Sequence, residues 1–128
     1  MRPWGLFLKN KFLIANMAEL ASCPNVVMKV GGMSMPYAGF GWEKCSAPPS
    51  SVELAAKLGP WYRYLVETFG PSRCMFESNF PPDNASAPYR TTWNMFKLIA
   101  KDYSAEDRAL LFHDTAVRVY KIGKGGKL

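Results

Sequence analysis

The sequence has little histidine and little cysteine: its 128 residues include one His and three Cys. The histidine, His113, has no second His and no nearby Cys beside it in the sequence, so the usual nitrogen and sulfur ligands of zinc are not available. The cysteines are odd in number, widely spaced and without a CxxC pair, which argues against a disulfide framework. We therefore expect no metal site in this chain and a reducing, cytoplasmic setting.

The sequence also lacks an apolar run of the roughly 20 residues that a membrane helix needs. Its apolar N-terminus imitates a signal peptide, but Lys9, Asn10 and Lys11 divide that stretch into two short parts. Phosphate-binding patterns such as GxGxxG, or GxxxxGK followed by Ser or Thr, do not occur. The sequence thus predicts no membrane contact and offers no nucleotide-binding motif.

Acidic residues are scarce at the two ends of the chain, although the net charge is +6. Residues 1–16 hold three basic residues and no acidic one, and residues 118–128 hold four basic residues and no acidic one. Between these ends, basic and acidic residues nearly balance. Because no exposed aromatic residues accompany the basic ends, we expect them to be solvated and predict no nucleic-acid partner.

Apolar residues are plentiful, at 48% of the chain against 20% charged, which is enough for one globular domain. The spacing of these residues predicts helices near residues 6–22, 51–69, 88–101 and 104–121, and short buried strands near 25–30 and 73–78. Within the helices we expect a cap at Ser50-Ser51, a break or kink at Gly59-Pro60, and a cap at Asp114.

The alternation of strands and helices predicts an α/β fold with two parallel strands and flanking helices. A sheet of two parallel strands has two open edges and two faces that need cover. The sequence therefore indicates an incomplete sheet.

Polar side chains follow both predicted strands. Lys29 and the loop to Trp42 lie at the end of the first strand, and Glu77, Asn79 and Asp83 lie at the end of the second. In parallel α/β folds the reacting groups lie at this end of the strands. An ordinary polar junction between strand and loop explains the same pattern, so both interpretations stay open at this point.

Four spaced segments resemble the C-terminal part of the amidohydrolase-related family of predicted metal-dependent hydrolases with a TIM-barrel fold. The segments are NVVMKVGG at 25–32, PPSSVELA at 48–55, FGPSRCMFESNFP at 69–81 and LFHDTAVRVY at 111–120. The resemblance implies that the two strands correspond to the seventh and eighth of a (β/α)8 barrel. Because such a barrel takes about 250 residues, it also implies that this chain is the C-terminal portion of a barrel and incomplete.

The resemblance also implies site residues. Many relatives end the eighth strand with an Asp that binds metal and activates water, and this sequence has Asn79 there. An amide can orient a water molecule or hold a carbonyl oxygen, but it takes up no proton at neutral pH. With Asp83 as a nearby carboxylate, the predicted catalytic residues are Asn79 and Asp83. The predicted substrate-binding residues are Lys29, Glu77 and Trp42.

The function that the resemblance implies is hydrolysis of a small carboxylated or lactone-like substrate. Water would attack a carbonyl group at the rim formed by the strand ends, with cleavage of a C–O bond, as in a lactone, or of a C–N bond. We expect this chain alone to hold no cofactor and to be inactive, while a longer parent protein could hold a divalent metal. The alternative is a non-catalytic α/β interaction module that pairs through its open sheet edges, which leaves room for a homo-oligomer.

Overall fold

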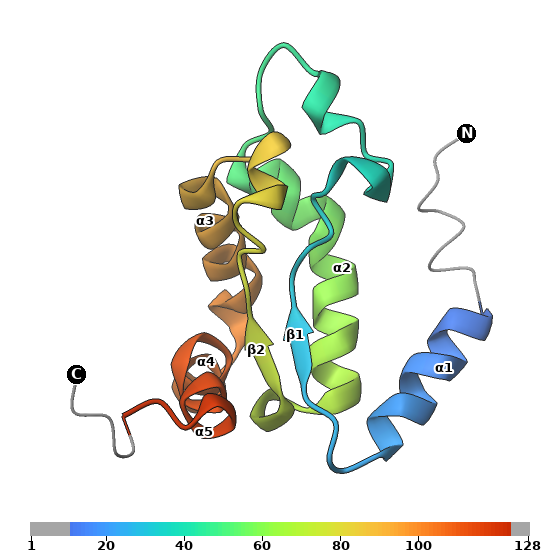
Figure 1. Cartoon of the computed structure of the whole chain (residues 1–128), viewed down its shortest axis with the longest axis vertical. Helices are drawn as coiled ribbons and strands as arrows, with labels where there is room; N and C mark the ends of the chain where they lie inside the picture. Colours follow the sequence, from blue (N-terminus) through green and yellow to red (C-terminus); the bar gives the residue numbers. More distant parts are fainter. Residues whose placement is uncertain (1–10, 124–128) are drawn as a thin grey trace.

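The structure is a computed structural model and describes residues 11–123 (Figure 1). Its α-helices are α1 (Lys11–Ser22), α2 (Ser51–Phe69), α3 (Tyr89–Ile99), α4 (Ala105–Ala109) and α5 (Thr115–Tyr120). Its strands are β1 (Met28–Val30) and β2 (Cys74–Phe76), and the short 3-10 helices include η4 (Pro82–Ala85). Residues 6–10 of the first predicted helix lie outside the described residues. Within residues 11–123, no helix has both the length and the apolar character that a membrane crossing requires.

The two strands run parallel and lie side by side at the centre of Figure 1. Their register pairs Met28 with Cys74 and Val30 with Phe76. Both strands are shorter than the ranges that the sequence indicates. Because the strands are parallel, the loops that follow them, residues 31–50 and 77–88, meet at the same end of the molecule, at the top of Figure 1.

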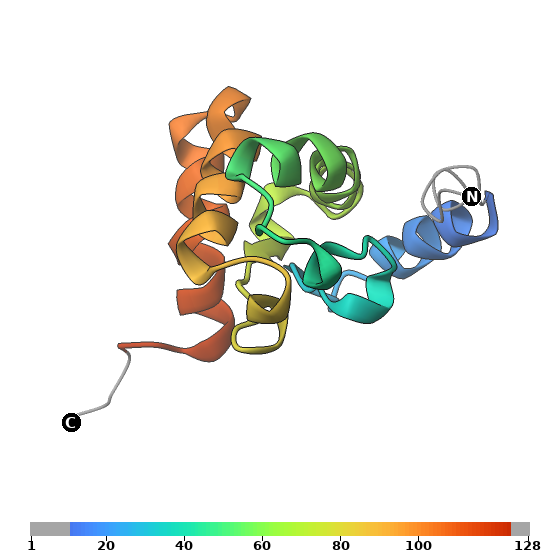
Figure 2. The same cartoon turned by 90° about the horizontal axis from the view of Figure 1, so that it is seen from above.

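Helix α2 connects the two strands and runs without a break. Ser50 caps it through a capping box, in which the Ser50 hydroxyl accepts from Glu53 N and the Glu53 carboxylate accepts from Ser50 N at 2.8 Å. Of the break or kink predicted at Gly59-Pro60, the break is wrong, because Pro60 lies inside the continuous helix, whereas Figure 2 shows that the helix changes direction along its length. Leu58 and Trp61 on either side of this dipeptide are buried, so packing holds both halves of the helix against the core.

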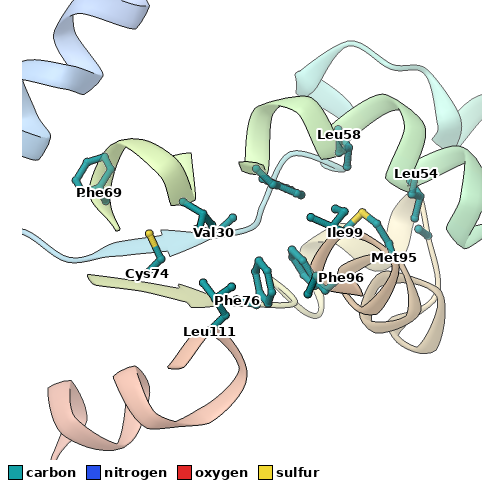
Figure 3. Close-up of a cluster of buried hydrophobic side chains, with 14 of the residues drawn as sticks. Val30, Leu54, Leu58, Phe69, Cys74, Phe76, Met95, Phe96, Ile99 and Leu111 are labelled. Atoms are coloured by element: carbon teal, nitrogen blue, oxygen red, sulfur yellow. The ribbon is translucent and has the colours of Figure 1, made fainter. Parts of the chain in front are cut away.

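The hydrophobic core lies between the sheet, α2, α3 and the last helices (Figure 3). Val30 and Phe76 project into it from neighbouring strands, and Phe76 stacks on Phe96 of α3 at 4.4 Å between ring centroids. Leu58 of α2 and Leu111 complete it, each fully buried. Figure 2 shows α2 and α3 next to each other, with α1 standing out from this body.

The last helical segment is continuous from α4 to α5 through a π-helical turn at Leu110–Asp114. It begins at Ser104, whose hydroxyl accepts from Asp107 N at 3.0 Å. The cap expected at Asp114 is wrong, since this residue has helical backbone angles and makes no side-chain capping bond. A residue inside a helix does not have the extended backbone that an N-cap requires.

Arg73 joins α1 to the rest of the molecule. Its guanidinium donates to the carbonyl oxygens of Ala21 at 2.8 Å and Cys23 at 2.9 Å, which lie at the end of α1. Its Nε donates to Phe69 O, at the end of α2, at 3.0 Å. The carbonyl ends of helices carry partial negative charge, so one cation stabilises the ends of two helices at once.

Candidate functional site

The ends of β1 and β2 approach each other closely at Gly31 and Glu77. Glu77 N donates to Val30 O at 3.1 Å, which extends the strand pairing by one bond. A Cβ placed on Gly31 would lie 2.4 Å from the backbone oxygen of Glu77 and 2.5 Å from its Cγ. Only glycine fits there, and this close contact fixes Glu77 at the rim.

Lys29 and Glu77 form an ion pair between the two strands, with 3.1 Å between Nζ and Oε2. Their side chains are 53% and 24% exposed. The hydrogen bond that Lys29 donates to Glu77, followed by the negative charge of Glu77, raises the pKa of Lys29. Because an exposed pair contributes less than about 1 kcal/mol to stability, both groups stay accessible to a ligand at little cost.

Asn79 and Asp83 form a second pair, at the start of the loop that follows β2. Asn79 Nδ2 donates to Asp83 Oδ1 at 2.7 Å, and Asp83 N donates to Asn79 O at 3.1 Å. The other carboxylate oxygen, Asp83 Oδ2, accepts from Ser34 N at 3.3 Å. Asp83 therefore ties the loop after β2 to the loop after β1.

Asp83 is only 3% exposed, although it carries a carboxylate. Burial raises its pKa, the hydrogen bonds from Asn79 and Ser34 act in the opposite direction, and the negative charge of Glu77 raises it further. Each of its carboxylate oxygens accepts a hydrogen bond from a different loop. Such a group is placed to hold neighbouring groups rather than to meet a substrate directly.

The loop after β1 makes another buried hydrogen bond, which the sequence does not indicate. Met33 N donates to the hydroxyl of Tyr62 on α2 at 3.2 Å. Tyr62 is 1% exposed, and burial raises its pKa. Together with the Ser34–Asp83 bond, this fixes two successive backbone amides just after Gly32, whose φ of +80° favours glycine. The roles of Tyr62 and Ser34 could not be predicted from the sequence, because each hydrogen bond joins a backbone N–H to a side chain far away along the chain.

Trp42 lies in a separate part of the same loop. Its ring stacks on Phe40, with 4.3 Å between centroids, and it is half-buried against the edge of the core. Among residues 11–123, no hydrogen bond or ion pair joins Trp42 to the two polar pairs. The structure thus joins Lys29 to Glu77 and Asn79 to Asp83, and within the described residues it shows no polar bond from Trp42 to either pair.

The chemistry of this rim is that of an ammonium group, two carboxylates and one amide. In the described part of the chain, no three His, Cys, Asp or Glu residues come together in a way that could hold a metal ion. The described residues therefore do not fit a metal centre by themselves. An ammonium and an amide can bind carboxylate or carbonyl oxygens by charge and hydrogen bonding.

Comparison with known proteins relates the chain to one family. The family model described as amidohydrolase matches residues 8–122. An uncharacterized protein, y4mH, from Sinorhizobium fredii (strain NBRC 101917 / NGR234) is 34% identical over 106 residues. That match covers 83% of this chain and 31% of the relative.

The solved structures that resemble the chain include an amidohydrolase from Burkholderia multivorans with bound zinc and the same protein with bound HEPES. Each has a TM-score of 0.72 and 26% sequence identity, and each match covers 85% of this chain and 36% of that protein. The chain therefore spans about a third of the length of the relatives it matches. The comparison confirms the predicted fold class: two parallel strands with flanking helices, the C-terminal portion of a TIM barrel.

Proposed function

The chain belongs to the amidohydrolase family, and on that premise we propose that its rim is part of a hydrolytic site. At this site water attacks the carbonyl carbon of a small carboxylated or lactone-like substrate, and the C–O bond of a lactone or the C–N bond of an amide breaks. One observation carries the proposal: the loops after both strands bring their polar groups to the same rim, where Asp83 joins them.

Asn79 and Asp83 are the pair that we propose for catalysis, with Asn79 at the substrate and Asp83 behind it. The amide of Asn79 would orient the attacking water or hold the carbonyl oxygen of the substrate. Asp83 provides the nearby carboxylate, and its bond to Asn79 at 2.7 Å supports a shared role.

Lys29, Glu77 and Trp42 are the proposed substrate-binding residues. The ammonium of Lys29 is the positive charge that a carboxylated substrate would meet, and Glu77 holds this ammonium in place. Trp42 offers an aromatic surface, stacked on Phe40, for an apolar part of the substrate.

We propose a role for a divalent metal only in a longer protein that contains this chain. The Burkholderia relative has bound zinc. Residues 11–123 bring together no ligand set for such an ion, so a divalent metal would need ligands from outside them. We assign no step to a metal in this chain.

We further propose that the 128-residue chain alone does not turn over substrate. Within the described residues, Asn79 cannot accept a proton from water at neutral pH, and both carboxylate oxygens of Asp83 are already bonded. The test is to incubate the purified chain with a panel of lactones and amides, with and without added zinc. Hydrolysis that disappears in Asn79→Ala would overturn the proposed inactivity.

Binding tests the proposed site without requiring turnover. In an NMR titration with glutarate and γ-butyrolactone, we expect shifts at Lys29, Glu77 and Asn79. Lys29→Met should weaken glutarate binding, and the control Lys57→Met, on the exposed face of α2, should not. Shifts confined to other parts of the chain, or equal affinities for the two variants, would contradict the proposal.

A second candidate function rests on the edge of β1 that does not pair with β2. In the described residues the sheet has these two strands only. A pocket of about 290 Å³ beside β1 is lined mainly by apolar residues, including Met17 of α1, Met28 of β1 and Leu65 of α2, and Lys29 also lines it. An open edge next to an apolar pocket suits a non-catalytic module that pairs with a second copy of itself.

Sedimentation velocity distinguishes this module from the hydrolytic site. The module requires a defined dimer, which Met17→Glu should dissociate because it places a charge in the apolar pocket. A monomer at all concentrations would remove this second candidate and leave the rim site unaffected.

A further inference from the structure

The burial and the hydrogen bonds of Asp83 limit what its carboxylate can do in the Asn79–Asp83 pair. Asp83 is 3% exposed, and its two oxygens are taken by Asn79 Nδ2 at 2.7 Å and by Ser34 N at 3.3 Å. A buried carboxylate bonded on both oxygens cannot reach a substrate without breaking these bonds. Any influence of Asp83 on the reaction must therefore pass through the groups that it holds.

The orientation of the Asn79 amide follows from what an ionised carboxylate can do. A carboxylate only accepts hydrogen bonds, so the nitrogen of the amide faces Asp83 and the oxygen faces away. No hydrogen bond from the residues that the structure describes reaches Asn79 Oδ1, and this oxygen is not among their buried polar atoms without partners. An accessible acceptor is thus left at the rim.

We propose that Asp83 is a positioning residue, which locks the Asn79 amide so that Oδ1 is the atom presented to the ligand. This inference rests on the proposed function, and it makes that function more specific. Asn79 Oδ1 then accepts a hydrogen bond from an O–H of the attacking water or from an N–H or O–H group of the substrate, without taking up a proton. A carbonyl group of the substrate has no hydrogen to donate, so it does not bind to Oδ1.

The surroundings of the pair support a positioning role. Ser34 N comes from the loop after β1, so the carboxylate fixes the Asn79 amide relative to the opposite side of the rim. Asn79 has a φ of 47°, a left-handed backbone that Asn adopts more easily than most residues. A Cβ placed on Gly32 would lie 3.6 Å from Asn79 Nδ2, so the amide packs over a glycine. The amide is therefore held by its own backbone, by a neighbouring turn and by Asp83.

The variant Asp83→Asn gives a sharp test because it keeps the size of the side chain. The backbone N–H of Ser34 still needs an acceptor, so the oxygen of the new amide would face Ser34 and its nitrogen would face Asn79. Two amide nitrogens cannot bond to each other, so the Asn79 amide must turn and bring Oδ1 inward. The substitution thus removes the acceptor from the rim without creating a cavity.

NMR on the isotope-labelled chain reads this change directly. In the wild type, one side-chain amide proton of Asn79 should be protected from solvent exchange by its bond to the carboxylate. In Asp83→Asn, this protection should fall about tenfold or more, as expected for loss of a hydrogen bond to a charged group. Asp102→Asn, the same change at an exposed residue of the described chain, should leave Asn79 unaltered. Unchanged protection of Asn79 in Asp83→Asn would overturn the proposal.

A measurement on the wild type keeps the proposal testable if the variant does not fold. The side-chain amide of Asn79 and the backbone amide of Ser34 should shift with the titration of the Asp83 carboxyl, followed by its own carbon resonance. The nearby acid Glu77 has a separate carboxyl resonance, so its titration can be told apart. Shifts of Asn79 that follow Glu77 and not Asp83 would contradict the positioning role.

A double-mutant comparison distinguishes positioning from a purely structural role. Asp83→Asn should weaken the binding of γ-butyrolactam, whose N–H can donate to Asn79 Oδ1, by about tenfold in Kd, and it should have no further effect in the Asn79→Ala background. An equal loss in both backgrounds would show that Asp83 acts through the fold and would overturn the proposal. If the Asn79 amide reorients as expected while γ-butyrolactam does not bind the wild type, the proposed function fails and the positioning of Asn79 stands.

Discussion

The close approach of the strand ends predicts that Gly31→Ala is strongly destabilising. The φ of Gly31 lies outside the left-handed region, so alanine meets no backbone penalty there, and the effect is one of space alone. The new Cβ would lie 2.4 Å from the backbone oxygen of Glu77, and a backbone atom cannot rotate away. The strands must separate at the bond between Glu77 N and Val30 O.

The expected loss is about 3 kcal/mol, toward the upper end for adding a methyl group to a packed site. For a chain of 128 residues, 1 kcal/mol corresponds to about 4 °C in Tm, so we expect a fall of about 12 °C. Circular dichroism melts give the Tm, and hydrogen exchange at the Glu77 amide reports the local bond, which should exchange faster in the variant.

The matched control is Gly59→Ala, the same change in the middle of α2. A Cβ there would meet the end of the Arg63 side chain at 3.3 Å, and helix propensity favours alanine. This variant should be neutral or up to about 1 kcal/mol more stable. A Tm for Gly31→Ala within about 2 °C of the wild type would refute the steric argument.

Three further predictions concern the core, the thiols and the buried acid. Leu58→Ala removes a fully buried side chain and should cost about 3 kcal/mol in urea unfolding, whereas loss below about 1 kcal/mol would contradict its place in the core. Cys23 and Cys45 are exposed and should react with a thiol reagent in the folded chain. Cys74 is buried, and burial raises its pKa to about 12, so it should react only after unfolding. Burial raises the pKa of Asp83 above its usual value of 3.8, so the folded chain holds this proton more tightly than the unfolded chain. Urea unfolding across the pH range gives the free energy of unfolding of the wild type relative to Asp83→Asn. This difference should be highest at or below about pH 4 and should fall as the pH rises through the folded pKa of Asp83. The opposite slope would contradict the burial of this carboxylate.

Features encoded by neighbouring residues could be predicted from the sequence. The cap at Ser50 follows from a polar residue three positions before Glu53, and the structure shows the reciprocal bonds. The fold class follows from short apolar runs that alternate with helices, together with motifs typical of one family. The polar groups after each strand are also visible, because a parallel sheet brings both strand ends to one rim.

Features that depend on distant parts of the chain could not be predicted. Pro60 stays inside α2 because packing of Leu58 and Trp61 holds the helix together, and local propensity does not contain this information. The ties from Ser34 to Asp83 and from Met33 to Tyr62 use backbone N–H groups, which every non-proline residue carries. No pattern of side chains distinguishes these two amides from the others.

Helix α1 is held to the rest of the molecule by few contacts, among them those of Arg73. It can therefore detach from the core without unfolding of the whole domain. The bonds of Arg73 to Ala21 and Cys23, the bond from Tyr64 Oη to Ile14 O, and the apolar packing of α1 on α2 hold this helix from one side only. The main core, by contrast, is enclosed by several elements. Elements with few buried contacts open with a smaller free energy than the whole domain. Hydrogen exchange should therefore divide the chain into two cooperative units, with Arg73 as the side chain that couples them.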